Sequence, residues 1–126
     1  MEDIKKLKND NKLPIIFSLT CYSADFDSPY MNCLGEEMLR SDTGGAIAFY
    51  GASGLSMAYD NFAFSNALFD VIFKEKTFIL GDIIQKTRRK LKYENHMNLE
   101  NADVYNLLGD PALQIQFPTF SYDSVI

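Results

Sequence analysis

The chain has 126 residues, 47% of them hydrophobic and 23% charged, a balance that predicts at most one ordinary globular domain. Its formal net charge is −5, with acidic residues spread along the chain, so we expect no nucleic-acid partner. No run of about 18 apolar residues occurs, which argues against a membrane span. Residues 1–12 are polar with alternating charges, and we do not expect them to form a signal peptide.

The first predicted elements lead to a cysteine. Residues 12–20 contain a short continuous apolar run opened by a proline, which is typical of a parallel strand buried on both faces. This strand ends directly at Cys21. A polar loop over residues 24–29 follows, and residues 33–39 are predicted to form a short helix that ends near Gly44 and Gly45.

The second half of the chain repeats the strand and helix pattern. Residues 46–50 are predicted to form another buried strand, which opens into a loop of small residues. Two amphipathic helices are expected over residues 62–74 and 80–91, with Asp60 and Asn61 as candidate caps of the first.

The C-terminal part is predicted to close the sheet. After a polar link and a short apolar stretch at residues 104–108, the run Gly109-Asp110-Pro111 is a strong turn signal. Residues 112–117 alternate between apolar and polar side chains, which predicts the last strand.

These elements predict an α/β fold with a mainly parallel sheet and helices on its faces. Only three strands are visible in the sequence. Parallel strands that are apolar on both sides would leave one costly unpaired edge. We therefore expect further strands to come from an upstream segment or from another chain.

Cys21 is the first candidate for chemistry. In an open α/β sheet, reactive residues follow the carboxyl ends of the strands, where a thiol near backbone N–H groups has a lowered pKa. Position alone also fits a buried structural cysteine. The two cysteines, Cys21 and Cys33, are too few for a disulfide framework, and we predict that they are not joined and that Cys33 is buried.

Five short segments stand in a fixed order along nearly the whole chain. They are residues 14–21, with Asp25, Asp27 and Pro29 after them; Cys33-Leu-Gly-Glu-Glu-Met-Leu39; Gly44-Gly-Ala-Ile-Ala48; Ala52-Ser53; and Tyr105-Asn-Leu-Leu-Gly-Asp-Pro-Ala-Leu113. Together they resemble the second half of the catalytic domain in the gingipain-type (C25) cysteine peptidases. By this resemblance, residues 1–126 are the C-terminal part of one caspase-like peptidase domain.

The resemblance implies a caspase-like three-layer α/β/α fold of which this chain holds the C-terminal three strands, with the last strand between the other two. It also implies that Cys21 is the nucleophile and that the base is a histidine in an upstream His-Gly segment. The chain has one histidine, His96, downstream of Cys21 and without a following glycine, so we expect it to be a surface residue.

The resemblance also places a substrate pocket beside Cys21. The loop after the second strand would form one wall of the pocket for the residue before the scissile bond, with Ser53, Ser56, Met57 and Tyr59 as candidates. The alternative is that these side chains pack the end of the sheet. No cofactor or metal is expected, because Asp25 and Asp27, two residues apart in a loop, are most simply turn residues.

The function implied by the resemblance is that of a cysteine-type peptidase, in which a thiolate attacks a peptide carbonyl and forms an acyl-enzyme. We expect this chain to be inactive alone. Its expected partners are a peptide or protein substrate and the upstream half of the same domain. The implied location is extracellular or on the surface of a bacterium.

Three other functions stay open. An enzyme of the same family could act as a C-terminal-processing or sorting transpeptidase. The missing histidine favours a non-catalytic caspase-like binding module instead. A nucleotide-binding or flavodoxin-like domain is the third possibility, but the glycines of residues 51–54 do not form a G-x-G-x-x-G or Walker pattern.

Overall fold

The computed structural model describes residues 2–93 and 102–117 and contains one three-stranded mixed sheet. Strand β1 (Ile15–Ser18) pairs in parallel with β2 (Ala48–Ala52), and β2 pairs in antiparallel with β3 (Tyr105–Leu108). Every residue of β2 is buried, whereas β1 is only half-buried. Among the strands of the described residues, β2 is therefore central, and β1 is an edge strand with a partner on one side only.

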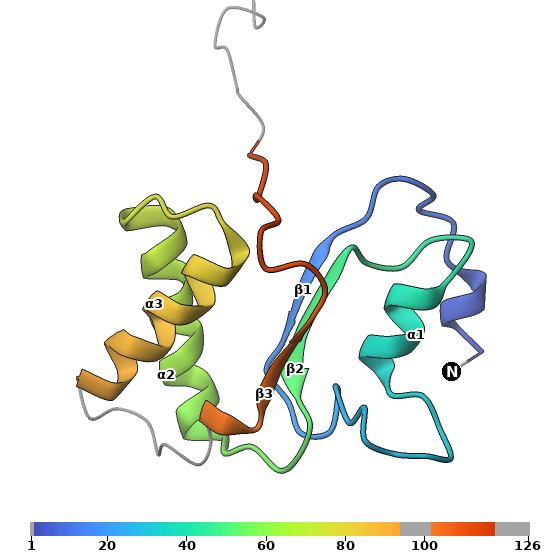
Figure 1. Ribbon diagram of the computed structural model, residues 1–126, viewed down its shortest axis with the longest axis horizontal. Helices are drawn as coiled ribbons and strands as arrows, with labels where there is room; N and C mark the ends of the chain where they lie inside the picture. The colour runs from blue at the N-terminus through green and yellow to red at the C-terminus, as the bar shows by residue number, and fades with distance from the viewer. Residues whose placement is uncertain (1, 94–101, 118–126) are drawn as a thin grey trace, which may run out of the picture.

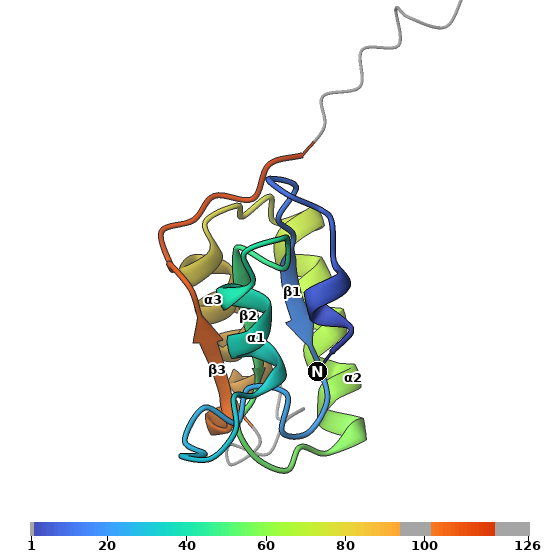
Figure 2. The same cartoon turned by 90° about the vertical axis from the view of Figure 1, so that its right-hand side faces the viewer.

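Helices cover both faces of this sheet. Helix α1 (Leu34–Arg40) and the short 3-10 helix η1 (Ile4–Lys6) lie on one side, and α1 stands in front of the sheet in Figure 2. Helix α2 (Ala58–Phe69), its π-helical continuation η2 (Asp70–Lys74) and α3 (Leu80–Tyr93) lie on the other side (Figure 1). The predicted α/β class is thus confirmed. Within the described ranges, no helix is both long and apolar enough to span a membrane.

The main core lies between the sheet and the α2–α3 layer. Its centre is an aromatic stack in which Tyr50, Phe64 and Tyr105 place their ring centroids 5.5, 5.6 and 5.8 Å apart. All three rings are buried, and Leu80 and Ile83 of α3 pack in the same cluster. Because large aromatic side chains bury much area and pack in defined orientations, this stack fixes α2 and β3 relative to β2.

The predicted helices are confirmed with shifted ends. The helix expected from residue 62 begins earlier, at Ala58, with Met57 as its N-cap. Asp60 and Asn61, the predicted caps, therefore lie inside the first turn of α2. The prediction was wrong there because the side chain of Asn61 donates to the backbone of Leu19 and to the hydroxyl of Ser56, not to the start of its own helix.

The predicted third strand was wrong in its position. The strand is β3, in the short apolar stretch before Gly109, and residues 112–117 form only an isolated bridge between Gln114 and Ile79. The alternation of residues 112–117 still has a structural cause, because Leu113 and Ile115 pack against the core. Their backbone groups bond to Asp110, to Phe78 and to Leu80, the first residue of α3, and not to the sheet.

The predicted strand order was also wrong. Ile16 lies opposite Phe49, so the first two strands are neighbours and the last strand is not between them. Helix α3 runs back along α2 toward the end of the sheet where β2 finishes (Figure 1). As a result β3 starts beside the last residue of β2, with Tyr105 opposite Ala52, and runs antiparallel.

Candidate active site

Cys21 lies just beyond the end of β1 and is partly exposed. Because β1 and β2 are parallel, their carboxyl ends meet at one edge of the sheet, and the loop after β2 reaches the same place. Two backbone hydrogen bonds tie the turn after Cys21 to the end of β2, one from Tyr22 to Gly54 (3.0 Å) and one from Ala24 to Ala52 (2.9 Å). This pairing holds the thiol against the loop.

Ser56 makes three contacts with the sulfur of Cys21. Its backbone N–H donates to Sγ at 3.3 Å, its hydroxyl oxygen lies 3.6 Å from Sγ, and its carbonyl oxygen accepts from the thiol at 3.4 Å. The backbone N–H and then the hydroxyl of Ser56 lower the pKa of the Cys21 thiol, against a smaller opposing effect of burial. Donors that favour the charged form make the thiolate, the nucleophilic form, more available.

The backbone directly after Cys21 is strained. Tyr22 has a φ of +54°, in the left-handed region that a bulky side chain rarely adopts. Such a conformation costs about 1 to 2 kcal/mol relative to ordinary backbone. Strain of this kind is found at functional sites where the surrounding structure imposes it, here through the bond from Tyr22 to Gly54.

The other predicted site residues spread along the loop after β2. Ser53 turns toward β3, because its hydroxyl donates to the carbonyl of Val104 at 3.1 Å and accepts from the amide of Asn106 at 3.1 Å. Met57 and Tyr59 are exposed at the start of α2. Of the four candidates, Ser56 is the residue that the structure brings into contact with Cys21.

Sequence reasoning missed two residues behind Ser56. Asn61 of α2 donates from Nδ2 to the Ser56 hydroxyl at 3.0 Å, and the hydroxyl of Tyr105 donates to Asn61 Oδ1 at 2.7 Å. The sequence predicts Asn61 as a helix cap, and Tyr105 as part of a short apolar stretch and the first residue of a segment that carries the family resemblance. No local pattern connects them to Cys21, because they come from α2 and β3 and meet only through the fold.

Cys33 differs from Cys21 in its surroundings. It is buried at the start of α1, and burial raises the pKa of its thiol. Both cysteines are free, as the sequence predicted. Asp25 shares a hydrogen bond with Asp27, which raises the pKa of Asp25 together with burial and the repulsion between the two carboxylates. His96 lies outside the described residues.

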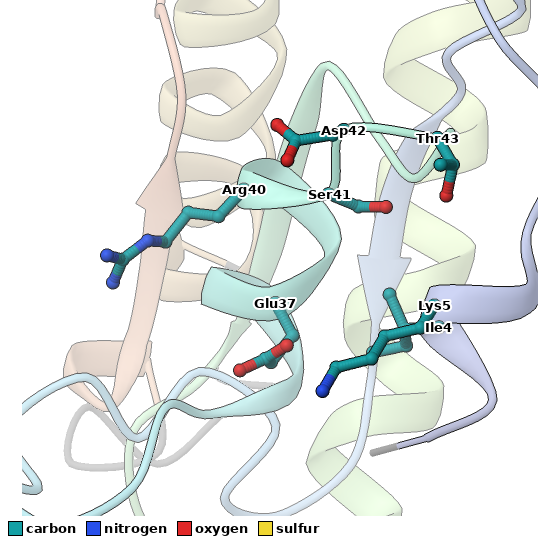
Figure 3. Close-up of a pocket in the computed structure, with 7 residues that line it drawn as sticks. All are labelled: Ile4, Lys5, Glu37, Arg40, Ser41, Asp42 and Thr43. Carbon is teal, nitrogen blue, oxygen red and sulfur yellow. The ribbon is translucent and has the colours of Figure 1, made fainter.

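A separate pocket of about 290 Å³ lies between η1 and α1 (Figure 3). Charged side chains line it, among them Lys5, Glu37, Arg40 and Asp42, and in Figure 3 Arg40 points away from Lys5. The guanidinium of Arg40 contacts Asn32 at 3.4 Å. None of its lining residues contacts Cys21, so this pocket is not part of the thiol site.

Comparison with solved structures shows which fold the chain shares. Gingipain R, described as an Arg-specific cysteine proteinase, superposes with a TM-score of 0.77 at 20% sequence identity, covering 91% of this chain and 28% of that one. A chain described only as a protease gives a TM-score of 0.76 at 21% identity, covering 90% of this chain and 30% of that one. The chain thus spans less than a third of the length of either protein.

Comparison with families gives the closer assignment. No curated protein matches the chain. The model of peptidase family C25 matches residues 1–116, which include Cys21, the loop after β2 and all three strands. Because this match covers nearly the whole chain, the chain belongs to peptidase family C25.

Proposed function

We propose that Cys21 is the nucleophile of a cysteine peptidase and that this chain carries the thiol half of the active site. The observation that supports the proposal is the thiol itself, partly exposed at the carboxyl end of a parallel strand with the backbone N–H and the hydroxyl of Ser56 against its sulfur. The thiolate attacks the carbonyl carbon of a peptide, and the C–N bond breaks as the leaving amine takes up a proton. Water then hydrolyses the acyl-enzyme and regenerates the thiol.

The reaction needs a base and an oxyanion site besides the thiol. A histidine must accept the thiol proton and then protonate the leaving amine. By resemblance to the family, we place this histidine in the upstream half of the domain. The backbone N–H of Cys21, which also lowers the pKa of its own thiol, is our candidate for one oxyanion donor.

The loop after β2 is the proposed wall of the substrate pocket. Met57 and Tyr59 present exposed side chains beside Ser56, which already contacts the sulfur. Ser53 would support this wall from behind through its hydrogen bonds to Val104 and Asn106. We also keep the extracellular or cell-surface location as part of the proposal, since the family resemblance implies it.

The open edge of β1 is the proposed docking surface for the upstream half. An apolar groove of about 570 Å³ runs along this edge, between β1 and the α2–η2 helix. Ile15, Phe17 and Leu19 form one side of it, and Leu68 and Ile72 form part of the other. A further strand added at β1 would pair its free backbone groups and cover these side chains, as a buried-type strand requires.

The first test compares the chain alone with the same chain extended by its upstream half. We expect the extended protein to cleave members of a mixed peptide library at least about 100-fold faster, because general acid–base catalysis contributes that much or more. Cleavage is followed by mass spectrometry of the products. Comparable rates for the short and the extended protein would show that the base does not come from upstream.

The second test examines the groove with two substitutions on the same helix. Phe69 lines the groove and is 56% exposed, while Phe62 lies outside it and is 67% exposed. We expect Phe69→Glu to weaken binding of a separately supplied upstream half by about tenfold or more, because an unpaired carboxylate would be buried in the interface. Phe62→Glu should change the affinity by less than about threefold. Calorimetric titration measures both, and equal effects would contradict docking at this edge.

A further inference from the structure

A chain of hydrogen bonds leads from the sulfur of Cys21 through Ser56 and Asn61 to Tyr105. The hydroxyl of Ser56 faces Sγ on one side and accepts a hydrogen bond from Asn61 Nδ2 on the other. Asn61 Oδ1 in turn accepts from the hydroxyl of Tyr105 at 2.7 Å. We call Ser56, Asn61 and Tyr105 the Ser56 network. It joins the end of β1 to the loop after β2, the first turn of α2 and the start of β3.

Each bond in this network fixes the direction of the next. A serine hydroxyl has one hydrogen to donate, and the N–H of Asn61 occupies a lone pair of the same oxygen. The hydroxyl hydrogen stays available for the sulfur, which lies 3.6 Å from the same oxygen. Tyr105 donates to Oδ1, which sets the orientation of the Asn61 amide and so keeps its NH₂ group toward Ser56. Asn61 Nδ2 also lies 3.3 Å from the carbonyl oxygen of Leu19, which supports the same orientation.

The far end of the network is rigid. Tyr105 is 2% exposed, and its ring stacks on Phe64 with an interplanar angle of 8° and on Tyr50 with an angle of 22°. A ring held in this way places its hydroxyl at one point, without the entropy cost of ordering a mobile side chain.

We propose that Asn61 and Tyr105 are positioning residues that act through Ser56 to hold Cys21 as a thiolate aimed at the substrate. The inference rests on the proposed role of Cys21 as nucleophile. When the thiol is protonated, it donates to the carbonyl of Ser56, and when it ionises, the N–H and hydroxyl of Ser56 stabilise the charge.

The protonation of Tyr105 is consistent with a positioning role. Burial raises the pKa of Tyr105, a hydrogen bond with Ser56 opposes this in part, and the negative charge of Cys21 adds to the rise, so the hydroxyl of Tyr105 stays a neutral donor while the thiol ionises. Tyr105 is the titratable group of β3 that faces Cys21 across the network. Its contribution is therefore to orientation and not to proton transfer.

The test measures the titration of Cys21 in the chain as it is. The rate of alkylation by iodoacetamide is followed from pH 6 to pH 10, and mass spectrometry quantifies Cys21 and Cys33 separately. We expect Ser56→Ala to raise the midpoint for Cys21 by about one pH unit, because a hydrogen bond to a charged group is lost. Asn61→Leu and Tyr105→Phe should raise it by about half a unit each, since both loosen the Ser56 hydroxyl without removing it.

Two controls separate positioning from general destabilisation. Ser56→Thr keeps a hydroxyl and should keep the midpoint of the parent chain. Cys33 is buried, so its labelling rate rises only when the chain opens. If Asn61→Leu exposes Cys33, then Tyr105→Phe, which removes a single oxygen, decides the outcome.

An unchanged midpoint for Tyr105→Phe, with slow labelling of Cys33, would overturn the inference. That result would leave the role of Cys21 itself untouched. Failure of the proposed function is distinguishable, because it would appear as peptide cleavage that persists without the Cys21 thiol, whatever the titration shows.

Discussion

Gly45→Ala is expected to lower the free energy of unfolding by at least about 3 kcal/mol, a large part of the 5 to 15 kcal/mol that stabilises an ordinary domain. Gly45 has a φ of +112°, and a Cβ atom there would lie 2.0 Å from the carbonyl oxygen of Met38. That oxygen cannot withdraw easily, because it accepts the N–H of Ala46 at 2.9 Å. Asn9 holds Gly45 from the other side, with hydrogen bonds to its N–H (2.9 Å) and its carbonyl (3.0 Å).

The matched control is Gly54, which lies just after β2 as Gly45 lies just before it. At Gly54, an added Cβ would meet Val104 at 3.6 Å, an ordinary van der Waals contact, and the backbone is not in the left-handed region. We expect Gly54→Ala to change the free energy of unfolding by less than about 1 kcal/mol. Urea titrations followed by circular dichroism compare the two variants. Similar losses at both positions would show that the turn between α1 and β2 is not strained in the way described.

The sequence predicted the elements better than their arrangement. The apolar runs at β1 and β2 are local signals, since both strands are long enough and apolar enough to be recognised without neighbours. The position of β3 was missed, because residues 112–117 alternate as a strand does. The backbone of Leu113 and Ile115 is hydrogen-bonded to Leu80 and Phe78 and not to the sheet. The order and direction of strands depend on the path that the helices give the chain between them, which local patterns do not record.

In the candidate site too, single residues were predicted from the sequence, but their contacts across the fold were not. Cys21 was predicted because a strand leads directly to it and because the chain resembles the C25 family. Ser56 was predicted as a pocket residue, and its contact with the sulfur needed the parallel pairing of β1 and β2. The hydrogen bonds of Asn61 and Tyr105 behind Ser56 could not be predicted from sequence, because these two residues come from different elements. They meet only because β3 runs antiparallel and starts beside the end of β2.

Cys21→Ala has the largest expected effect on activity. In the protein extended by its upstream half, we expect this substitution to lower peptide cleavage by at least about 1,000-fold, because no acyl-enzyme can form without the thiolate. Substrate binding should change little, since the substitution keeps the backbone N–H of residue 21 and the loop after β2 that forms the proposed pocket wall. The loss should therefore appear in kcat and not in KM.

The control for this variant is the other thiol. Cys33 is buried at the N-terminus of α1, where its backbone N–H donates to the Glu36 carboxylate at 2.9 Å. Cys33→Ala removes a buried sulfur and is expected to cost about 1 kcal/mol of stability. Cys33 is buried and hydrogen-bonded to Glu36 at the start of α1. Cleavage by Cys33→Ala should therefore stay within about threefold of the parent protein.

Attack of Cys21 on the peptide is tested by kcat for the extended protein and its two cysteine variants against one cleaved peptide. We expect Cys21→Ala to fall to the background rate while Cys33→Ala keeps the parent rate. We also expect an acyl-enzyme on Cys21, visible by mass spectrometry of the acid-quenched parent. Persistent cleavage by Cys21→Ala, or an acyl group found on Cys33, would show that Cys21 is not the nucleophile.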